Sequence, residues 1–445
     1  MKNQIITLLS AACLLLAALP SAAQETSDVM SAAYREMWNS EVQQRIDHDI
    51  ETYRKADAVI KLDNVKPGTQ VKVEQLTSDF LFGGNIFLFG QFDTPEKNKR
   101  YEDVFGDLFN AASVPFYWKT LEPEKGKPRF TADSPAISRR PPTDPVVEFC
   151  ESKGIVMKGH AIIYGIRQWG HPDWMPADRK QMEAYFEDHV RQLAGRYQGR
   201  LQSWDVVNEA IDQADRGLMP DDYTYKTYLN AMKYFPESVE FNINDCDMHG
   251  GPRPRYVELV RNLIDRGIRI DNVGVEMHIF RPSEAEEIAA GSKSLSPEKI
   301  WATLDCFSQA ERPLLVSEVT ITAPDDTERG RAIQAELTRD LYRLWFSYPT
   351  VRAITWWNVA DGGAAPGEPS VSGLIDKDCN PKPAYEVLDN LINHEWHTNI
   401  SVPVEKDGTV SFRGFKGNYR LSWTDRKGNL QTMEYHVSGD AAVAQ

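Results

Sequence analysis

The sequence predicts an α/β protein: a (β/α)8 barrel with a small β-sheet accessory unit formed by the N- and C-terminal segments. Two observations predict the barrel. Short apolar runs alternate with helical patterns, and polar side chains follow directly after those runs. A third observation predicts the β unit, since apolar and polar residues alternate near both ends of the chain. The length of 445 residues and the hydrophobic content of 41% suffice for a large buried core.

The candidate barrel strands are short runs rich in β-branched or aromatic residues. They cover residues 80–87, 111–118, 155–162, 201–208, 239–245, 273–278, 314–318 and 351–357. Helical patterns separate them, and this alternation is typical of a TIM barrel. Counting alone leaves a ninth strand or an open doubly wound sheet as alternatives. The first strand lacks a following glycine-rich phosphate loop, which disfavours the nucleotide-binding form of the open sheet.

The segments around the barrel divide the chain further. Residues 24–78 predict an N-terminal helix followed by a β-hairpin, because the alternating runs 58–62 and 71–74 flank a turn-rich stretch. Residues 79–397 form the predicted catalytic barrel. Residues 398–445 predict a C-terminal β segment that packs with the hairpin. We favour a structural brace as the role of this unit, with carbohydrate binding as the alternative.

The first residues are typical of an export signal. Lys2 precedes the apolar run 5–19, and small residues stand just before Gln24, so residues 1–23 predict a cleaved signal peptide. We therefore expect a periplasmic or extracellular protein. Cys13 lies too early in the run for a convincing lipoprotein cleavage site. The rest of the chain contains no second stretch that could span a bilayer.

Charge and cysteine usage restrict the partners. The formal net charge is −15, which argues against nucleic-acid binding and leaves a neutral partner such as a glycan open. The oligomeric state is not indicated. The four cysteines after the signal lie far apart without CxxC spacing, so a zinc site is not expected and we predict no cofactor. We expect buried free thiols at these positions, which are Cys150, Cys246, Cys306 and Cys379.

Polar residues follow most of the predicted strands, at the barrel end where active sites lie. The fourth strand leads into Asn208 and Glu209, and the seventh ends in Glu318. Two carboxyl groups at one rim suit glycosidic cleavage, in which one protonates the leaving oxygen and the other attacks the anomeric carbon or activates water. Either residue alone could simply end a strand. The pair, with His278 and Trp357 at neighbouring strand ends, favours a catalytic site.

Several ordered motifs resemble glycoside hydrolase family 10, the family of many endo-β-1,4-xylanases. The stretch WDVVNEA at 204–210 resembles its acid/base motif, and LVSEV at 315–319 resembles its nucleophile strand. Further matches follow the order of that family along the chain from about residue 80 to 394. They are KGHAIIY at 158–164, GVEMH at 274–278 and GLIDKDCNPKPAY at 373–385.

The resemblance implies roles for individual residues. Glu209 is then the acid/base and Glu318 the nucleophile of a retaining hydrolase, with carboxyl groups about 5–5.5 Å apart. The substrate is a plant-type polysaccharide, most simply a β-1,4-linked xylan cut internally. The remaining implied contacts are with substrate or nucleophile. Asn208 binds a sugar 2-hydroxyl, His160 contacts the adjacent sugar, His278 supports the nucleophile, and Trp357 forms the floor under the ring, with Trp356 in the core.

The chain also departs from the family pattern where the non-reducing sugar binds. The usual Glu, Asn and Lys of the second strand are absent from SVPFYW at 113–118. Tyr164 stands for the usual tryptophan of the third strand, and Glu276 for the usual glutamine of the sixth. Thr320 stands for an aspartate after the nucleophile, and a second tryptophan is missing from 361–366. We expect Tyr164 and Glu276 to line a rebuilt substrate site, so the sugar preference stays open.

Two other classes of function remain as alternatives. A metal-dependent hydrolase could use His160, His278, Glu209 and Glu318 as ligands, although no strand carries a paired HxH. A non-catalytic glycan-binding protein on the same scaffold is the second alternative, and hydrolysis of a different glycan by the same mechanism is a third. The loop 167–176 carries Trp169 and Trp174, which either stack on sugar or pin the loop to the barrel.

Overall fold

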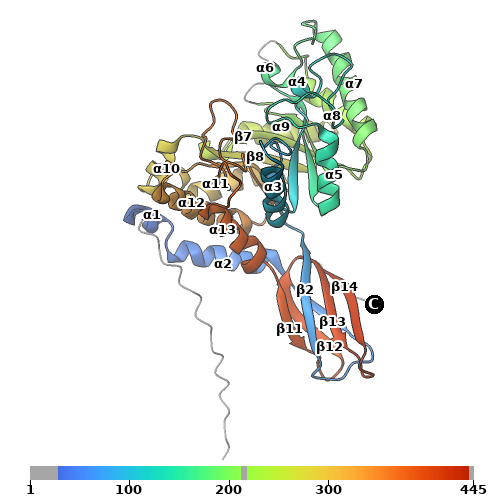
Figure 1. Cartoon of the computed structure of the whole chain (residues 1–445), viewed down its shortest axis with the longest axis vertical. Coiled ribbons are helices and arrows are strands. Elements are labelled where there is room, and N and C mark those ends of the chain that lie inside the picture. The colour runs from blue at the N-terminus through green and yellow to red at the C-terminus, as the bar shows by residue number, and fades with distance from the viewer. Residues whose placement is uncertain (1–28, 212–217, 440–445) are drawn as a thin grey trace, which may run out of the picture.

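The computed structural model describes residues 29–211 and 218–439 and shows a helix-covered barrel from which a small β unit projects (Figure 1). The predicted signal peptide and Cys13 lie outside the described residues. Eight parallel strands of the described chain close the barrel in the order β10-β3-β4-β5-β6-β7-β8-β9, which confirms the predicted fold. They are β3 (Leu81–Asn85), β4 (Ala111–Pro115), β5 (Val156–Tyr164), β6 (Ser203–Asn208), β7 (Glu240–Asp247), β8 (Asn272–Ile279), β9 (Leu314–Ile321) and β10 (Val351–Trp356).

Helices connect the strands and cover the outside of the barrel. Side-chain caps begin several of them, as Asp178 does for α7, Ser296 for α11 and Thr327 for α12. They are α3 (Pro95–Leu108), α4 (Trp118–Leu121), α5 (Thr143–Lys153), α6 (Arg167–Gly170), α7 (Arg179–Tyr197), α8 (Tyr223–Tyr234), α9 (Pro254–Asp265), α10 (Pro282–Ala289), α11 (Pro297–Ser308), α12 (Glu328–Ser347) and α13 (Pro383–Asp389). Short 3-10 or π-helical turns occur at Met248–Gly250, Lys293–Leu295 and Asn390–Glu395.

Residues expected to form one N-terminal helix form two, α1 (Ala32–Met37) and α2 (Ser40–Arg54). The break occurs because Asn39 caps α2, and its side chain accepts bonds from the first backbone N–H groups of that helix. Both helices pack beneath α12 and share the hydrophobic core of the barrel. The Tyr34 hydroxyl donates a 2.8 Å hydrogen bond to the buried Asp340 of α12. The N-terminal helices therefore belong to the barrel rather than to the β unit.

The expected N-terminal hairpin does not form. β1 (Lys55–Lys61) pairs with β12 (Thr409–Phe415), whereas β2 (Gln70–Ser78) lies between β11 (Asn399–Pro403) and β13 (Gly417–Thr424) in another antiparallel sheet. The stretch after β1 bonds to the C-terminal segment instead of closing a tight turn, since the Leu62 and Gly68 N–H groups donate to Gly408 and Val404. β14 (Leu430–Val437) completes the second sheet.

The strands of both termini thus assemble one unit, as predicted, with a small core of its own. Its buried residues come from both ends of the chain and are Ala56, Ala58, Ile60, Leu62, Val65, Val71, Val73, Val404, Val410, Phe412, Tyr419, Leu421 and Val437. β2 ends at Ser78 and β3 begins at Leu81, so the unit joins the barrel at the N-terminal ends of its strands. This is the end opposite to the predicted active site.

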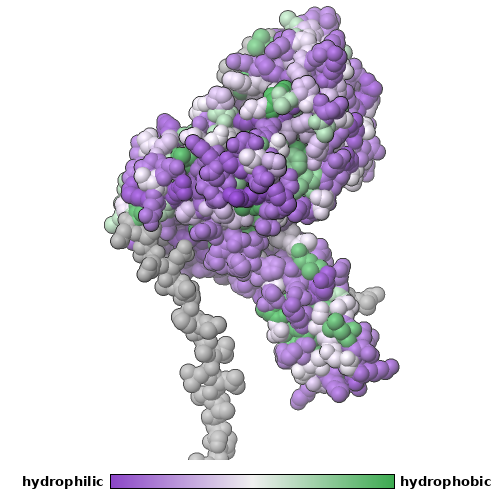
Figure 2. Space-filling model, in the orientation of Figure 1, coloured by the Kyte–Doolittle hydropathy of each residue, from purple (hydrophilic) through white to green (hydrophobic). Residues whose placement is uncertain are grey.

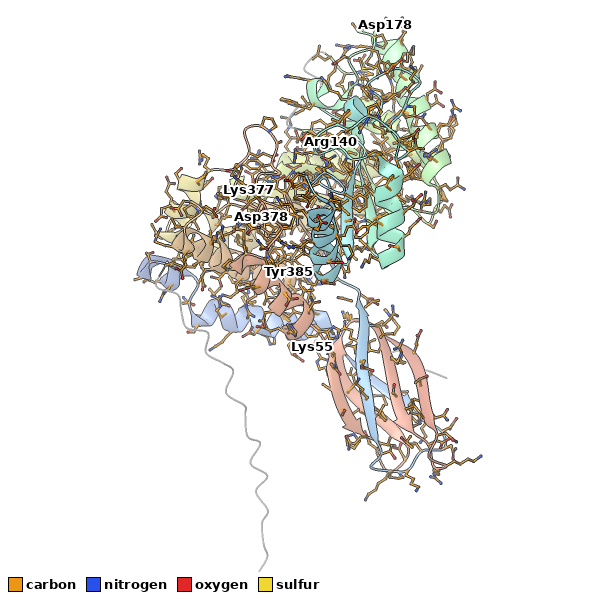
Figure 3. The ribbon with its side chains drawn as sticks, in the orientation of Figure 1. Lys55, Arg140, Asp178, Lys377, Asp378 and Tyr385 are labelled. Atoms are coloured by element: carbon orange, nitrogen blue, oxygen red, sulfur yellow. The ribbon has the colours of Figure 1, made fainter. Side chains whose placement is uncertain are left out.

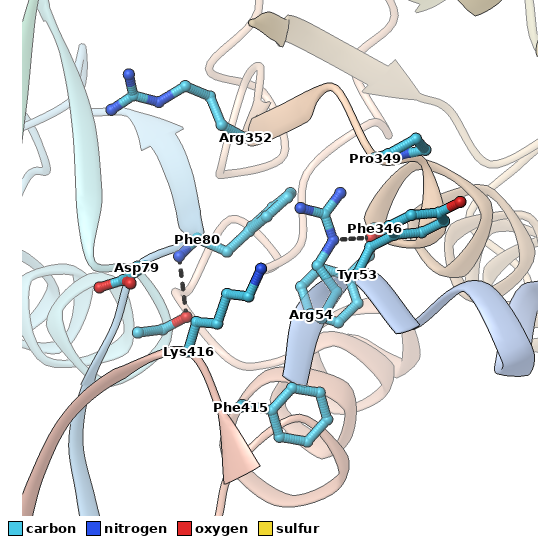
Figure 4. A pocket seen from close by; sticks show the side chains of 10 residues that line it. Tyr53, Arg54, Asp79, Phe80, Phe346, Pro349, Arg352, Phe415 and Lys416 are labelled. Atoms are coloured by element: carbon cyan, nitrogen blue, oxygen red, sulfur yellow. Dashed lines mark hydrogen bonds between the residues drawn. The ribbon is translucent and has the colours of Figure 1, made fainter. Parts of the chain in front are cut away.

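A pocket of about 210 Å³ marks the junction between the β unit and the barrel (Figure 4). Arg54, the last residue of α2, packs against the rings of Phe80 and Phe346, at 4.8 and 5.3 Å from their centroids. Its guanidinium donates hydrogen bonds to the carbonyls of Phe346, Tyr348 and Val351, the last at 2.8 Å. Arg54 thereby ties α2 to the segment that connects α12 with β10.

The visible face of the molecule is mostly hydrophilic, and its apolar patches are small and separate (Figure 2). Among the described residues, no helix combines the length and the apolar character needed to cross a membrane. Cys150, Cys306 and Cys379 are free and buried, which confirms that prediction for these three. The side chain of Cys246 lies outside the described residues.

Candidate active site

The carboxyl ends of β6, β7, β8 and β9 bring the predicted catalytic residues together. Asn208 ends β6 and Glu209 follows it, while Glu318 lies within β9. Glu276 and His278 belong to β8, where Glu276 is paired in register with Glu318. Side chains on neighbouring parallel strands with matched register meet on one face. The barrel therefore collects three carboxyl groups and one imidazole in a single buried cluster.

The backbone holds Glu209 in a left-handed conformation, with φ of 52°. Its N–H donates a 2.9 Å bond to the carbonyl of Asn244 on β7. On the other side, a Cβ at Gly165 would stand 2.3 Å from the Glu209 carbonyl, so the end of β5 requires glycine at that position. A conformation of this kind costs a non-glycine residue about 1–3 kcal/mol and is common at functional sites.

The surroundings of Glu209 favour its protonated form. Burial raises the pKa of this carboxyl group to about 7, and the negative charges of Glu318 and Asp245 act in the same direction. A hydrogen bond from the Tyr164 hydroxyl to Oε1 of Glu209 opposes the rise. Glu209 can thus carry a proton near neutral pH, as a general acid must.

Asn244 connects the catalytic residues. Its Nδ2 lies 2.6 Å from Oδ1 of Asn208 and 3.0 Å from an oxygen of both Glu276 and Glu318. The Asn244 side chain fits because Gly274 lies beside it on β8, where a Cβ would stand 2.2 Å from Oδ1 of Asn244. The amide donates to acceptors on three strands, and it therefore fixes the positions of the nucleophile candidate and of Asn208 relative to each other.

His278 supplies positive charge to this cluster. Its Nε2 lies 3.5 Å from Oε2 of Glu276 and 3.6 Å from Oε2 of Glu318, and its Nδ1 lies 2.9 Å from the Thr320 hydroxyl. Burial alone lowers the pKa of His278, but the two carboxyl groups outweigh it and raise the pKa to about 10. Burial and the charge of Glu318 raise the pKa of Glu276 well above its ordinary value. These directions favour an imidazolium at His278 and a proton on Glu276.

Glu276, His278 and Glu318 also have the spacing of a metal-binding group, since one ligand atom from each lies within 4.8 Å of the others. A metal would have to displace the proton that His278 holds between the two carboxyl groups, because only the neutral imidazole is a ligand. Binding of a metal here would therefore cost the cluster its imidazolium charge.

His160 extends the cluster towards β4. Its Nδ1 is 2.8 Å from the buried Asp205, which is also 3.1 Å from Lys158. Burial alone raises the pKa of Asp205, but Lys158 and His160 outweigh it and hold the pKa below its ordinary value. Nε2 of His160 lies 3.0 Å from the Tyr117 hydroxyl and 3.7 Å from Oε1 of Glu318. The imidazole is thus positioned between its carboxylate partner and the nucleophile candidate.

An aromatic wall stands beside His160. Trp357 follows β10, and its ring packs edge-on against Phe87 and His160, at centroid distances of 5.0 and 5.3 Å. Trp357 lies next to the site, where the floor under a sugar was expected, but it is only 4% exposed. Trp356 points the other way and is fully buried, with its Nε1 bonded to the Ser372 carbonyl, which confirms its place in the core.

Two loop tryptophans behave differently. Trp174 donates a 2.8 Å bond to the carbonyl of Glu122 and packs edge-on against Trp118, so it holds its loop to the barrel. Trp169 is 60% exposed and is the one that remains available to a ligand.

Asp361, which follows the eighth strand, forms a buried 3.0 Å ion pair with Lys382, and this pair gives Asp361 a structural role.

Sequence reasoning missed some residues that the site contains. The sequence marks Asn244 only as a polar residue near the end of an apolar run, and its contact with Glu318 depends on the glycine of a neighbouring strand. Tyr117 was noted only where a family motif is missing, yet its hydroxyl bonds to His160. Arg139 and Arg140 come from the segment between α4 and α5, which has no periodic pattern to reveal their place at the mouth.

Known proteins resemble the chain both in sequence and in fold. Residues 96–391, more than half of the chain, match the family described as glycosyl hydrolase family 10. The chain belongs to glycosyl hydrolase family 10. The resemblance inferred from the motifs is thereby confirmed, and the family-10 barrel encloses the residues described above.

Relatives of this family-10 chain are distant. Endo-1,4-beta-xylanase B of Thermotoga neapolitana is 24% identical over 300 residues, which cover 62% of this chain and 78% of the relative. The anti-sigma-I factor RsgI6 of Acetivibrio thermocellus is 25% identical over 394 residues, covering 87% of this chain. The chain spans about half of that protein, 47% of its length. The crystal structure of xylanase 10B from Thermotoga maritima shares the fold, with a TM-score of 0.57 at 20% identity over 71% of this chain and 96% of the other.

Proposed function

We propose that the protein is a retaining glycoside hydrolase that cuts β-1,4 bonds within a xylan-type plant polysaccharide. One observation carries this proposal: two carboxyl groups at one barrel mouth have different partners. Burial and neighbouring negative charge favour a proton on Glu209, whereas Glu318 accepts from Asn244 and faces protonated His278. Family membership and the xylanases among the relatives support the substrate class.

In the first step, Glu209 gives its proton to the glycosidic oxygen as Glu318 bonds to the anomeric carbon, so the leaving sugar departs with a hydroxyl group. In the second step, the ionised Glu209 takes a proton from water, whose oxygen bonds to the anomeric carbon and releases Glu318. Both residues end in their starting forms. Two displacements at the same carbon give overall retention of configuration.

The neighbouring residues suit the two steps. His278 and Asn244 orient Glu318 for attack through the contacts described above. Asn208 accepts from Asn244, which leaves its own amide N–H groups for the sugar 2-hydroxyl. Such a bond strengthens as positive charge develops on the sugar ring and therefore favours the transition state.

The test is product analysis on purified protein with xylan, arabinoxylan and arabinogalactan. Short β-1,4-linked oligosaccharides from xylan support the proposal, and NMR of the first anomer released distinguishes retention from inversion. A Glu318→Ala variant should lose turnover. Activity that disappears with a chelator and returns with a divalent ion would favour the metal-dependent hydrolase instead.

The same experiment separates the remaining alternatives. Hydrolysis of another glycan but not xylan would keep the mechanism and change the substrate. Binding of a glycan by the wild-type protein without any turnover would identify a non-catalytic binding protein, for which the absent second-strand residues are the supporting observation.

We also propose export through the predicted signal peptide. N-terminal sequencing of the protein from its native host tests this proposal, and a mature start near Gln24 would support it.

A further inference from the structure

Two consecutive arginines, Arg139 and Arg140, occupy the side of the mouth near β3, β4 and β10. This is where the family pattern would supply Glu, Asn and Lys from the second strand, and the chain has none of these. Figure 3 labels Arg140 on the barrel rather than on the terminal β unit. The two arginines differ in their partners, and the difference indicates what this part of the site binds.

Arg139 is engaged by protein groups. Its Nε donates a 2.7 Å bond to the Gly363 carbonyl, and Nη2 donates a 2.8 Å bond to Oδ1 of Asn358. The same nitrogen lies 3.7 Å from Glu368, which also accepts from Asn358. Its charge is therefore balanced by a carboxylate, and Arg139 serves to fix the loop that carries its neighbour.

Arg140 feels the charge of Glu368 only from a distance and does not bond to it. Its guanidinium stacks 3.9 Å from the centroid of Tyr117 and 4.9 Å from that of Phe87. Among the described residues, the guanidinium donates one hydrogen bond, to the Arg139 carbonyl at 2.9 Å. Within the described chain, no carboxylate forms an ion pair with it. Burial lowers the pKa of Arg140 to about 10, which still leaves it charged at neutral pH.

The position of Arg140 points to the substrate. The Tyr117 ring that it covers bonds through its hydroxyl to His160, and His160 lies 3.7 Å from Glu318. Arg140 is thus separated from the proposed nucleophile by two aromatic side chains in contact. The sugar that Glu318 attacks, and the units attached on its non-reducing side, would extend along this wall.

We propose that Arg140 binds an acidic group of the glycan, the carboxylate of a uronic acid or a sulfate ester, on the nucleophile's side of the cleaved bond. This inference rests on the proposed function and refines its substrate class. A guanidinium has five N–H donors in a planar fork that matches carboxylate and sulfate oxygens, and here most of them are unused. A partly buried cation stacked on a tyrosine gains most from an anionic partner, because the site shields the pair from water.

The opposing interpretation is that Arg140 only supports Tyr117 through its ring contact. The two interpretations differ for matched substrates. A glucuronic-acid-substituted xylan and its carboxyl-reduced form share one backbone and differ in the anionic group, as do a sulfated glycan and its desulfated form. If Arg140 binds the anionic group, the wild-type protein should prefer the acidic member of one pair by about 10- to 100-fold in kcat/KM or Kd. No variant is needed for this comparison, so a folding defect cannot obscure it.

Variants then assign the preference to the residue. Arg140→Gln should remove the preference, mainly by raising KM for the acidic substrate towards its value for the neutral form. Arg140→Lys should restore part of it, because the charge stays and the fork is lost. Arg191→Gln is the matched control: Arg191 is an exposed arginine on α7 paired with Asp188, and its loss should leave the preference intact.

The substrate pair in which the wild-type protein prefers the acidic member shows whether the bound group is a uronic acid carboxylate or a sulfate ester. Equal kcat/KM for charged and neutral forms in both pairs, with hydrolysis intact, would overturn the inference and leave the proposed function standing. Preferential binding of the acidic form without any hydrolysis would overturn the proposed function and leave the anion site standing. An acidic preference that survives Arg140→Gln would overturn the assignment to Arg140.

Discussion

The hydroxyl group of Tyr164 donates a hydrogen bond to Oε1 of Glu209. This contact joins the residue that replaces the family's usual tryptophan to the residue that supplies the proton in the proposed mechanism. Because the hydrogen bond stabilises the ionised carboxylate, it holds the pKa of Glu209 below the value that burial and Glu318 would otherwise impose. The substitution at 164 therefore affects the acid as well as the sugar site.

Activity should fall as the pH rises through about 7, because Glu209 must be protonated in the first step and its pKa is about 7. In Tyr164→Phe, the carboxylate loses its donor, so the pKa should rise and the alkaline limb of kcat/KM should move to higher pH. A pH series on one soluble oligosaccharide measures the shift. An alkaline limb that stays in place or moves down would contradict the assignment of Glu209 as the acid.

Glu209 should also limit stability at alkaline pH. Its pKa is about 7 in the folded protein and near the ordinary 4.5 when unfolded, so the folded state binds more protons between these values. Stability should therefore decrease as the pH rises through this window. Glu209→Gln cannot ionise, and above pH 7 it should be more stable than the wild type by up to about 3 kcal/mol.

Thermal unfolding at pH 4 and pH 8.5 checks this expectation. The two proteins should unfold at similar temperatures at the lower pH and separate at the higher pH. The same variant should lose about 10²–10⁴-fold in turnover on a natural glycan, where a proton donor is needed. If the variant is less stable than the wild type at pH 8.5, the ionised Glu209 carboxylate does not destabilise the folded protein, and the expectation is wrong.

Glu276→Gln tests the protonation of the buried cluster. Burial and Glu318 raise the pKa of Glu276, so at neutral pH it should be a neutral acid, and glutamine has nearly the same shape and no charge. We expect kcat at pH 7 to stay within about threefold, because His278 and Asn244 keep their contacts with Glu318. Glu318→Gln is the control that should lose turnover. A large loss in Glu276→Gln alone would mean that position 276 works as a carboxylate.

The barrel could be predicted from the sequence because its strands are buried on both faces and appear as continuous apolar runs. β5 and β9 show this clearly, since both are almost entirely buried. The N-terminal hairpin was a wrong prediction for the opposite reason. β1 and β2 have a local turn signal, but each pairs with a strand more than 300 residues away, as Lys61 does with Thr409 and Gln70 with Pro403. A local sequence pattern cannot indicate a pairing strand that lies so far away along the chain.

The site was predictable where function depends on residues directly at strand ends, as for Asn208 and Glu209. It was not predictable where a contact needs two strands in register. Asn244 reaches Glu318 only because Gly274 lies beside it. Arg140 lies in an irregular segment, and only the folded chain shows that its guanidinium covers Tyr117.

The attachment of the N-terminal helices predicts a large effect for Arg54. Its guanidinium is buried, which lowers its pKa to about 9, and it donates to the carbonyls of Phe346, Tyr348 and Val351. Arg54→Met keeps the apolar stem and removes this donor from the three carbonyls, of which that of Tyr348 keeps a bond from the Val351 N–H. The lost bonds to buried acceptors should destabilise the protein by about 3 kcal/mol, measured by denaturant unfolding. Arg413→Gln is the matched control, because Arg413 is an exposed arginine paired with Glu51 and Asp57, and its loss should cost less than about 1 kcal/mol. Equal stabilities of the two variants would mean that α2 is held by its apolar face alone, and that the junction tolerates loss of the Arg54 guanidinium.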